Sequence, residues 1–203
     1  MESFWSWFAS NEKHLFSMKG SDDPIFAELA DKIREISPYI AFEIDESTAK
    51  DGKKILSISA DRNIEFFGLV EYFARIAPEL EHWDIVPFRQ RVPMDVLINL
   101  EIEGQEADDG VPVGEPVCVA CKDMKFIIEP GDYGVKITLY IKDYDGRELQ
   151  EGMAMHLMEQ AVGEYDLVKK VESIEFESQD RTPKHAMNFE NVSTLLDEFV
   201  PEN

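Results

Sequence analysis

The sequence predicts an α+β fold with a mostly antiparallel sheet and helices packed on one face. Some segments repeat apolar residues every three or four positions, which is the helical period. Others repeat them at every second position, which is the strand period. Strand segments often follow one another directly, as they do in antiparallel sheets. Apolar residues make up 44% of the chain, which is enough to build a core.

All 203 residues are assigned to a single domain, 1–203, because no linker clearly separates two cores. This domain is predicted to have three parts: a helical hairpin over 1–38, a sheet with two helices over 40–178, and a C-terminal helix over 188–200. The second helix of the hairpin starts at Asp23-Pro24, a cap followed by a first-turn proline.

The stretch from Ile55 to Arg91 is predicted to form strand, helix and strand, and the other elements can be arranged around it. Apolar and small polar residues alternate over 55–60, as in a half-buried strand. A helix over 64–77 follows, and Pro78 disfavours its continuation. Its apolar stripe predicts that it anchors a core. The stripe comprises Phe66, Leu69, Val70, Phe73, Ile76, Ala77 and Leu80.

This strand–helix–strand pattern recurs in the second half of the chain. A strand over 136–144 is followed by a helix with apolar residues at four-residue spacing, and then by a strand from Val171. One interpretation is a duplicated unit whose two halves share one sheet. The other is that any two α+β segments show such similarity.

The opening sequence contains the aromatic cluster FWSWF. A helix over residues 3–18 would carry Phe4, Trp5, Phe8, Leu15 and Met18 on one broad face. Such a cluster either binds a partner or a membrane surface, or packs on its own domain, and packing is the favoured interpretation. Further strands are expected over 40–44, 96–102 and 126–128, with a turn at 50–53. The acidic stretch 104–116, rich in glycine and proline, is expected to be a mobile loop.

The formal net charge of −22 argues against direct binding of nucleic acid and of anionic membranes. It allows a protein partner with a basic surface, although solubility alone also explains it. No apolar stretch approaches the ~20 residues of a membrane span. The N-terminus lacks the basic and apolar regions of a signal peptide, so a cytoplasmic protein is expected. The oligomeric state stays open.

Cys118 and Cys121 form a CxxC pair, which occurs in redox centres and in halves of zinc sites. A redox pair usually lies where a strand gives way to a helix, whereas these cysteines fall in a strand-and-turn pattern. Zinc needs four ligands, and the sequence has no second CxxC and no paired histidines. Structural thiols are therefore favoured over the metal and redox alternatives.

No other motif assigns chemistry to a residue. The sequence has no GxSxG elbow, phosphate loop or GxGxxG. The acidic residues of 101–109 lack the spacing of a calcium loop, so a solvated segment is the favoured interpretation. We therefore expect no catalytic, cofactor-binding or metal-binding residues and no cofactor. The residues considered are His14, His82, His156, His185, Glu101, Glu103, Glu106, Asp108 and Asp109.

Four segments together resemble a family of small, acidic, uncharacterised bacterial proteins, a domain of unknown function. They are the opening FWSWF with NEKHLF, the core ISADRNIEFFGLVEYFARIAPELEHWDIVPFR, KITLYIKDY, and GEYDLVKKVESIEF. The resemblance covers residues 3–178 as a pattern of aromatic and apolar positions. It implies a bacterial cytosolic protein and carries over no active site.

Two functional hypotheses follow. The first is a non-catalytic protein-binding or regulatory module, supported by the missing catalytic motifs and by the charge. The second is an enzyme or small-ligand-binding protein whose site is assembled from separate strands. A deep pocket holding His156 or the cysteines would favour the second.

Overall fold

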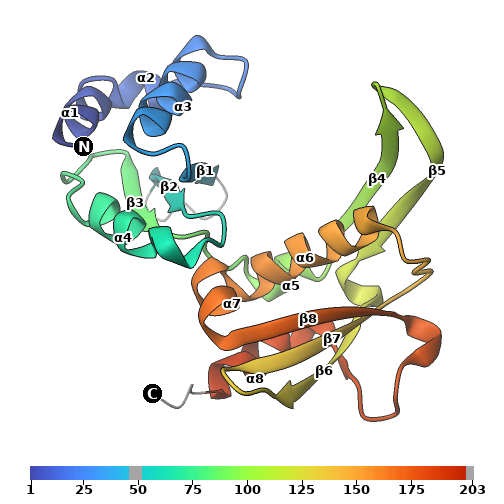
Figure 1. Ribbon diagram of the computed structural model, residues 1–203. Coiled ribbons are helices and arrows are strands. Elements are labelled where there is room, and N and C mark those ends of the chain that lie inside the picture. The colour runs from blue at the N-terminus through green and yellow to red at the C-terminus, as the bar shows by residue number, and fades with distance from the viewer. Residues whose placement is uncertain (46–51, 200–203) are drawn as a thin grey trace. The chain divides into compact units, whose positions relative to one another are not determined.

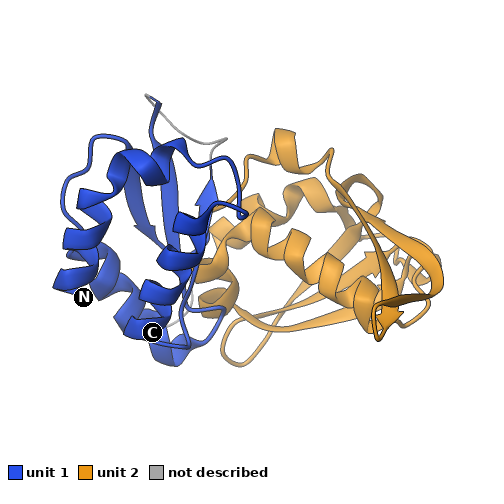
Figure 2. Ribbon diagram, turned by 90° about the horizontal axis from the view of Figure 1, so that it is seen from above, with its two compact units in different colours: residues 1–89 blue, residues 90–203 orange. Residues whose placement is uncertain are grey.

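The computed structural model describes residues 1–45 and 52–199, and the chain divides into two compact units. Unit 1 is Met1–Arg89 and unit 2 is Gln90–Asn203 (Figure 2). The sequence predicted one domain over 1–203, whereas each unit has its own sheet. The expected α+β class is confirmed. The expected turn at 50–53 falls mostly outside the described residues.

Unit 1 consists of helices followed by a three-stranded sheet (Figure 1). β1 and β2 are antiparallel, whereas β2 and β3 are parallel and are connected through α4. The strand order is β1-β2-β3. The elements are α1 (Glu2–Ser10), α2 (Glu12–Ser17), α3 (Pro24–Ile36), β1 (Ala41–Asp45), β2 (Lys54–Ser59), η2 (Ile64–Phe66), α4 (Phe67–Arg75) and β3 (Trp83–Pro87).

The N-terminal aromatic cluster packs inside unit 1, as the sequence favoured. Phe4, Trp5 and Phe8 are buried on α1. Trp5 Nε1 donates a hydrogen bond to the backbone oxygen of Phe73 on α4 at 3.1 Å. This bond satisfies the buried indole, which otherwise would lose its hydrogen bond to water. Phe73 is fully buried, so the predicted core role of the helix over 64–77 is confirmed.

Unit 2 contains a two-stranded hairpin, β4-β5, and a four-stranded sheet of order β8-β7-β6-β9. In the larger sheet β7 pairs antiparallel with β6 and parallel with β8. The elements are α5 (Met94–Leu97), β4 (Glu101–Asp108), β5 (Val111–Ala120), η3 (Cys121–Asp123), β6 (Lys125–Pro130), β7 (Val135–Ile141), α6 (Glu148–Val162), α7 (Glu164–Lys170), β8 (Val171–Ser178), η4 (Gln179–Arg181), β9 (Met187–Asn188), η5 (Phe189–Asn191) and α8 (Val192–Glu198).

The strand–helix–strand pattern seen in the sequence recurs in the topology. In unit 1 an antiparallel pair, β1 and β2, is followed by α4 and by β3 parallel to β2. In unit 2 the antiparallel pair β6 and β7 is followed by α6, α7 and β8 parallel to β7. The two halves therefore share a strand order but lie in separate sheets, which corrects the expectation of one shared sheet.

The core of unit 2 forms around α6. Its hydrophobic cluster draws on residues between Val92 and Phe199, with contributions from β5, the larger sheet, α6 and α8. Leu157 and Met158 of α6 are fully buried, as are Phe126 and Leu139 of the sheet. Gly163 separates α6 from α7 with a φ of 78°, a left-handed conformation that glycine adopts without strain.

Two sequence expectations in unit 2 are wrong. The strand expected over 96–102 begins only at Glu101, because α5 occupies the preceding residues and buries Leu97 in the core. The loop expected over 104–116 is a hairpin, because Asp109 and Gly110 turn the chain and bring β5 back along β4.

Within residues 1–45 and 52–199, no helix has both the length and the apolar character needed to cross a membrane.

Candidate functional site

The β4-β5 hairpin is the most distinctive surface feature of unit 2 (Figure 1). It is called the acidic hairpin here and comprises β4, β5 and the Asp109-Gly110 turn. Asp109 and Gly110 have φ values of 47° and 80°. Two successive residues with positive φ form the turn whose twist matches that of a two-stranded ribbon. The turn thus makes a hairpin, with a register shift between Gly104 and Glu106, from a stretch whose composition is typical of a loop.

The two halves of the hairpin differ in burial. Near its base, Ile102 of β4 and Val117 and Val119 of β5 pack against the core of unit 2. Toward the turn, all residues are exposed, including Val111 at 64% and Val113 at 48%. Both side chains and backbone of the distal half are therefore accessible to solvent.

The charge of the hairpin is of one sign. No lysine or arginine occurs between Arg91 and Lys122, whereas seven aspartates and glutamates do. The hairpin contributes six of these seven: Glu101, Glu103, Glu106, Asp108, Asp109 and Glu115. The cations near it lie on other elements. Lys122 Nζ lies 3.8 Å from Glu101, and Arg147 donates to the backbone oxygen of Glu115 at 3.2 Å.

At the base of the hairpin, Cys118 Sγ donates a hydrogen bond to Glu101 Oε1 at 2.8 Å. The two residues line a hollow of about 190 Å³ that also involves Asp123, Met124 and Lys142. The hydrogen bond from Cys118 and the nearby Lys122 lower the pKa of Glu101. Glu101 is therefore an anion at neutral pH.

Both cysteines of the CxxC pair are free thiols of raised pKa. Desolvation, followed by the hydrogen bond to Glu101, raises the pKa of Cys118 to about 11. Burial raises the pKa of Cys121, the first residue of η3, to about 11. A reactive thiol needs a lowered pKa, because the thiolate is the nucleophile and the metal ligand. This environment therefore favours the protonated, unreactive form.

The carboxylates that the sequence offered as a cation site are spread along an extended hairpin. Successive residues of a strand point to opposite faces, so Glu101 and Glu103 share one face, and Glu106 and Asp108 share the other. Among the described residues, no three His, Cys, Asp or Glu side chains are grouped so that they could hold a metal ion.

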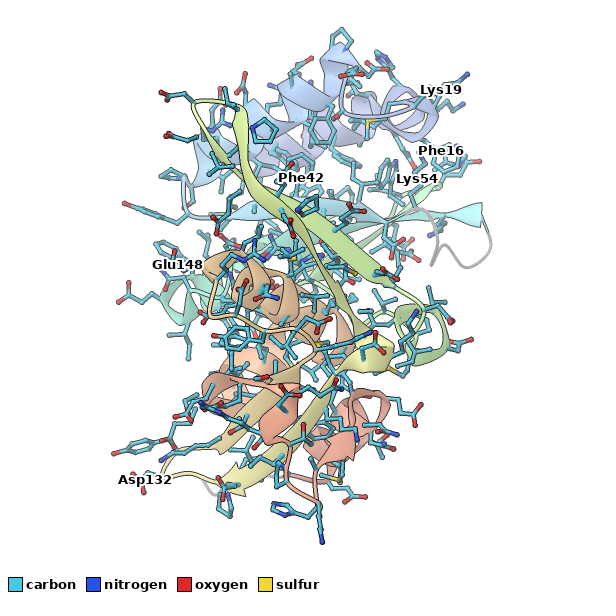
Figure 3. All side chains as sticks on the ribbon, turned by 90° about the vertical axis from the view of Figure 1, so that its right-hand side faces the viewer. Phe16, Lys19, Phe42, Lys54, Asp132 and Glu148 are labelled. Atoms are coloured by element: carbon cyan, nitrogen blue, oxygen red, sulfur yellow. The ribbon has the colours of Figure 1, made fainter. Side chains whose placement is uncertain are left out.

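The histidines are in separate environments. His156 Nε2 lies 3.0 Å from Gln160 Nε2, one turn further along α6. His14 lies 3.7 Å from Asp23. In unit 1 the His82 ring stacks on Phe16, over which Lys54 also lies, its Nζ 5.3 Å from the ring centroid (Figure 3). His185 is exposed in the connector before β9.

One polar cluster was missed by sequence reasoning. Arg91 donates to the backbone oxygen of Val162 at 2.8 Å and also pairs with Asp166 and Asp197. These carboxylates and hydrogen bonds raise the pKa of the Arg91 guanidinium. The partners lie 71 to 106 residues away in the sequence, so no local signal indicates the cluster. It ties the start of unit 2 to α7 and α8.

Comparison of the chain with protein-family models, with curated proteins and with solved structures found no match. The resemblance to an acidic bacterial family therefore stays an expectation.

Proposed function

We propose that this chain is a non-catalytic protein-binding or regulatory module whose partner presents a basic surface. The acidic hairpin is the proposed contact surface. The observation that carries the proposal is the run of 30 residues, 92–121, with seven acidic and no basic residues, which folds largely as an exposed hairpin. A surface of one sign attracts a cationic patch and repels phosphate groups.

The distribution of charge between the units supports this surface. Unit 2 contains 25 acidic and 10 basic residues, whereas unit 1 contains 17 and 10. The excess of negative charge is thus 15 in unit 2 and 7 in unit 1. Charge that served solubility alone would have no reason to exclude every cation from one hairpin. Screening acts over about 10 Å at 0.1 M salt, so binding should weaken as salt rises.

The alternative is an enzyme or ligand-binding protein whose site is assembled from separate strands. The hollow beside Cys118 favours it, since β5, η3 and the end of β7 all contribute residues. Its volume of about 190 Å³ is below the range typical of small-molecule sites, roughly 300–1,000 Å³. The raised pKa of Cys118 also provides no nucleophile there. We therefore prefer the binding module.

The proposal is tested by capturing partners from a bacterial lysate at low salt on immobilised protein, followed by a salt wash and mass spectrometry. A second column carries the variant Glu106→Gln, Asp108→Asn, Glu115→Gln. The unmodified protein should retain a basic protein that salt releases. The variant should lose it, because the replaced carboxylates lie in the distal half of the acidic hairpin.

The matched control is Glu129→Gln, Asp132→Asn, Glu190→Gln, which removes the same charge from exposed sites elsewhere in unit 2. Asp132 lies in the turn between β6 and β7 (Figure 3). The control should capture the same basic protein. If both variants lost the captured protein equally, binding would depend on the net charge of the chain and not on the acidic hairpin. A small metabolite that co-purifies with the protein would favour the ligand-binding alternative instead.

A further inference from the structure

The acidic hairpin has two edges, and they are not equivalent. β4 and β5 pair only with each other in the part of the chain that the structure describes, so each has one edge without a neighbouring strand. Figure 1 shows the hairpin extending away from the larger sheet of unit 2. An unpaired strand edge presents a row of backbone N–H and C=O groups to which another strand can bind.

The register identifies the backbone groups on the free edge of β4. The two-residue turn closes on the pair Asp108 and Val111, which therefore exchange hydrogen bonds. In an antiparallel pair such bonds occur at every second residue, so Ala107 directs its N–H and C=O away from β5. At the base, the N–H of Cys121 donates to Leu100 O at 3.3 Å, so Leu100 faces β5. The even-numbered residues therefore face β5 at both ends of β4. The register shifts between Gly104 and Glu106, and the outward residues of β4 are Glu101 and Glu103 before this shift, Gln105 within it and Ala107 beyond it.

Prolines interrupt the free edge of β5 but not that of β4. Pro112 pairs with Ala107, so it occupies a position where an N–H would point outward, and it has none. Pro116 also lacks an N–H. Between the prolines, Arg147 donates to Glu115 O at 3.2 Å, whereas the bond from Gln105 of β4 to Gly114 O, at 2.6 Å, runs across the hairpin. Proline on an edge strand is a common means of preventing strand addition.

β4 is free of proline over its whole length. The hairpin thus blocks strand addition on the distal half of β5 and leaves it open on β4. The open edge spans seven residues, 101–107, which is roughly 20 Å of extended chain. An incoming strand of this length would meet four outward residues.

We propose that an extended, lysine- or arginine-rich segment of a partner protein adds to the free edge of β4 as a third strand. The inference rests on the proposed function and specifies how the partner binds. Backbone hydrogen bonds would hold the segment in register, as in other cases of strand addition. Cations on both faces of the added strand would meet Glu101 and Glu103 on one side and Glu106 and Asp108 on the other.

The charges also decide against a second copy of this chain as the occupant. Pairing of β4 with β4 would set two rows of carboxylates directly opposite one another, and like charges across a strand pair are destabilising. A neutral strand would gain the backbone hydrogen bonds without the ion pairs. A basic extended segment can form both the backbone hydrogen bonds with the free edge and the ion pairs with its carboxylates.

The test uses synthetic ten-residue peptides that alternate lysine with valine or threonine. One peptide is unmodified. The others are N-methylated at every second residue, in either of the two phases, which removes the hydrogen bonds of one edge while retaining the charge. The affinity for the full chain is measured by calorimetry. The peptide methylated in one phase should bind at least about tenfold more weakly than the unmodified peptide, since several backbone hydrogen bonds are lost. The peptide methylated in the other phase should bind nearly as well as the unmodified peptide.

The matched protein variants are Ala107→Pro and Ala107→Thr. Proline at this outward position removes one N–H from the free edge without removing a bond to β5. It should weaken the unmodified peptide about threefold to tenfold, whereas threonine should leave the affinity nearly unchanged. Amide hydrogen exchange should show protection of Glu103 and Ala107 in the complex. The methylated peptides keep the test valid if Ala107→Pro does not fold.

The outcomes separate this inference from the proposed function. Equal affinity for all the peptides would overturn strand addition while leaving the acidic surface as a site for basic partners. Undiminished affinity in Glu106→Gln, Asp108→Asn would count against the acidic surface itself. Failure of the unmodified peptide to bind would overturn the strand inference. Dimers that dissociate in Ala107→Pro would assign the edge to a second copy and also overturn it.

Discussion

Cys118 donates its thiol hydrogen to Glu101, and these two residues lie on adjacent strands at the base of the acidic hairpin. The strand register places Cys118 opposite Glu103, so the bond runs diagonally to the next outward residue of β4. The contact stabilises the thiol in its protonated form and the carboxylate in its charged form. It also connects β5 to β4 at the base of the hairpin.

The first prediction concerns the reactivity of Cys118. Its thiol should react slowly with iodoacetamide at pH 8. The reaction rate should increase with pH, with its midpoint at an apparent pKa of about 11. In Glu101→Gln the repulsion of the thiolate is removed, so the pKa should fall and the rate at pH 8 should increase roughly threefold to tenfold. Mass spectrometry distinguishes Cys118 from Cys121.

Glu103→Gln is the matched control, because Glu103 affects the same thiol more weakly and without a hydrogen bond. Its effect on the rate should be smaller. An inflection near pH 8.5 in the unmodified protein, the value of a free thiol, would contradict the prediction.

The second prediction concerns Tyr144, whose hydroxyl donates to Glu151 at 2.5 Å. This bond, with some desolvation, raises the pKa of Tyr144 to about 12. Because the pKa is higher in the folded state than the unfolded value of about 10, the bond stabilises the fold fully below about pH 10. The stabilisation is lost as the pH rises toward 12.

Denaturant unfolding of Tyr144→Phe measures this contribution. The variant should be less stable by about 1 kcal/mol at pH 7, since the bond is partly exposed to solvent. The difference should shrink between about pH 10 and pH 12. Tyr133→Phe, at a tyrosine that is 88% exposed, should show no such dependence. A difference that stays constant with pH would mean that the phenol acts only through packing.

The third prediction concerns Phe73, which is fully buried and contacts two aromatic rings of α1. Its ring centroid lies 5.0 Å from that of Phe4 and 4.8 Å from that of Trp5. Phe73→Ala should destabilise unit 1 by about 3–5 kcal/mol, the cost of truncating a buried phenylalanine. Tyr72→Ala, on the exposed side of α4, is the control and should cost far less. A loss below about 1 kcal/mol for Phe73→Ala would contradict a core role.

The fourth prediction compares two glycines of unit 2. A Cβ on Gly134, in the turn before β7, would lie 2.4 Å from the backbone oxygen of Lys170. Gly134→Ala should therefore destabilise by about 1–3 kcal/mol, because backbone atoms must move. Gly152 lies within α6 with open space around it. Gly152→Ala should stabilise by about 0.5–1 kcal/mol through helix propensity. Thermal unfolding measures both, and equal effects would contradict the comparison.

Sequence periodicity was most informative where a segment has one strongly apolar face. The helix around Phe73 and the strand around Ile58 were predicted because the core imposes their periods of 3.6 and 2. The recurrence of strand, helix and strand was also visible. Its assignment to separate sheets was not, because strand periodicity does not specify which strands pair.

The region from Val96 to Pro116 shows where periodicity fails. Val96 and Leu97 are neighbours of similar hydrophobicity, yet Val96 is 53% exposed and Leu97 fully buried. The short helix α5 produces this difference, and its four residues are too few to show a helical period. Beyond it, the exposed half of the hairpin has no buried face, so its composition is typical of a loop.

The sequence by itself determined the α+β class, the core helix around Phe73 and the acidic, cation-free stretch, because composition and local periodicity are properties of neighbouring residues. The tertiary structure alone decided the division into two units, the contacts of Arg91 with Asp166 and Asp197, and the free edge of β4. These features depend on which distant segments pair. Each such pairing balances loop-closure entropy against burial and hydrogen bonding over the whole chain, and no local pattern records that balance.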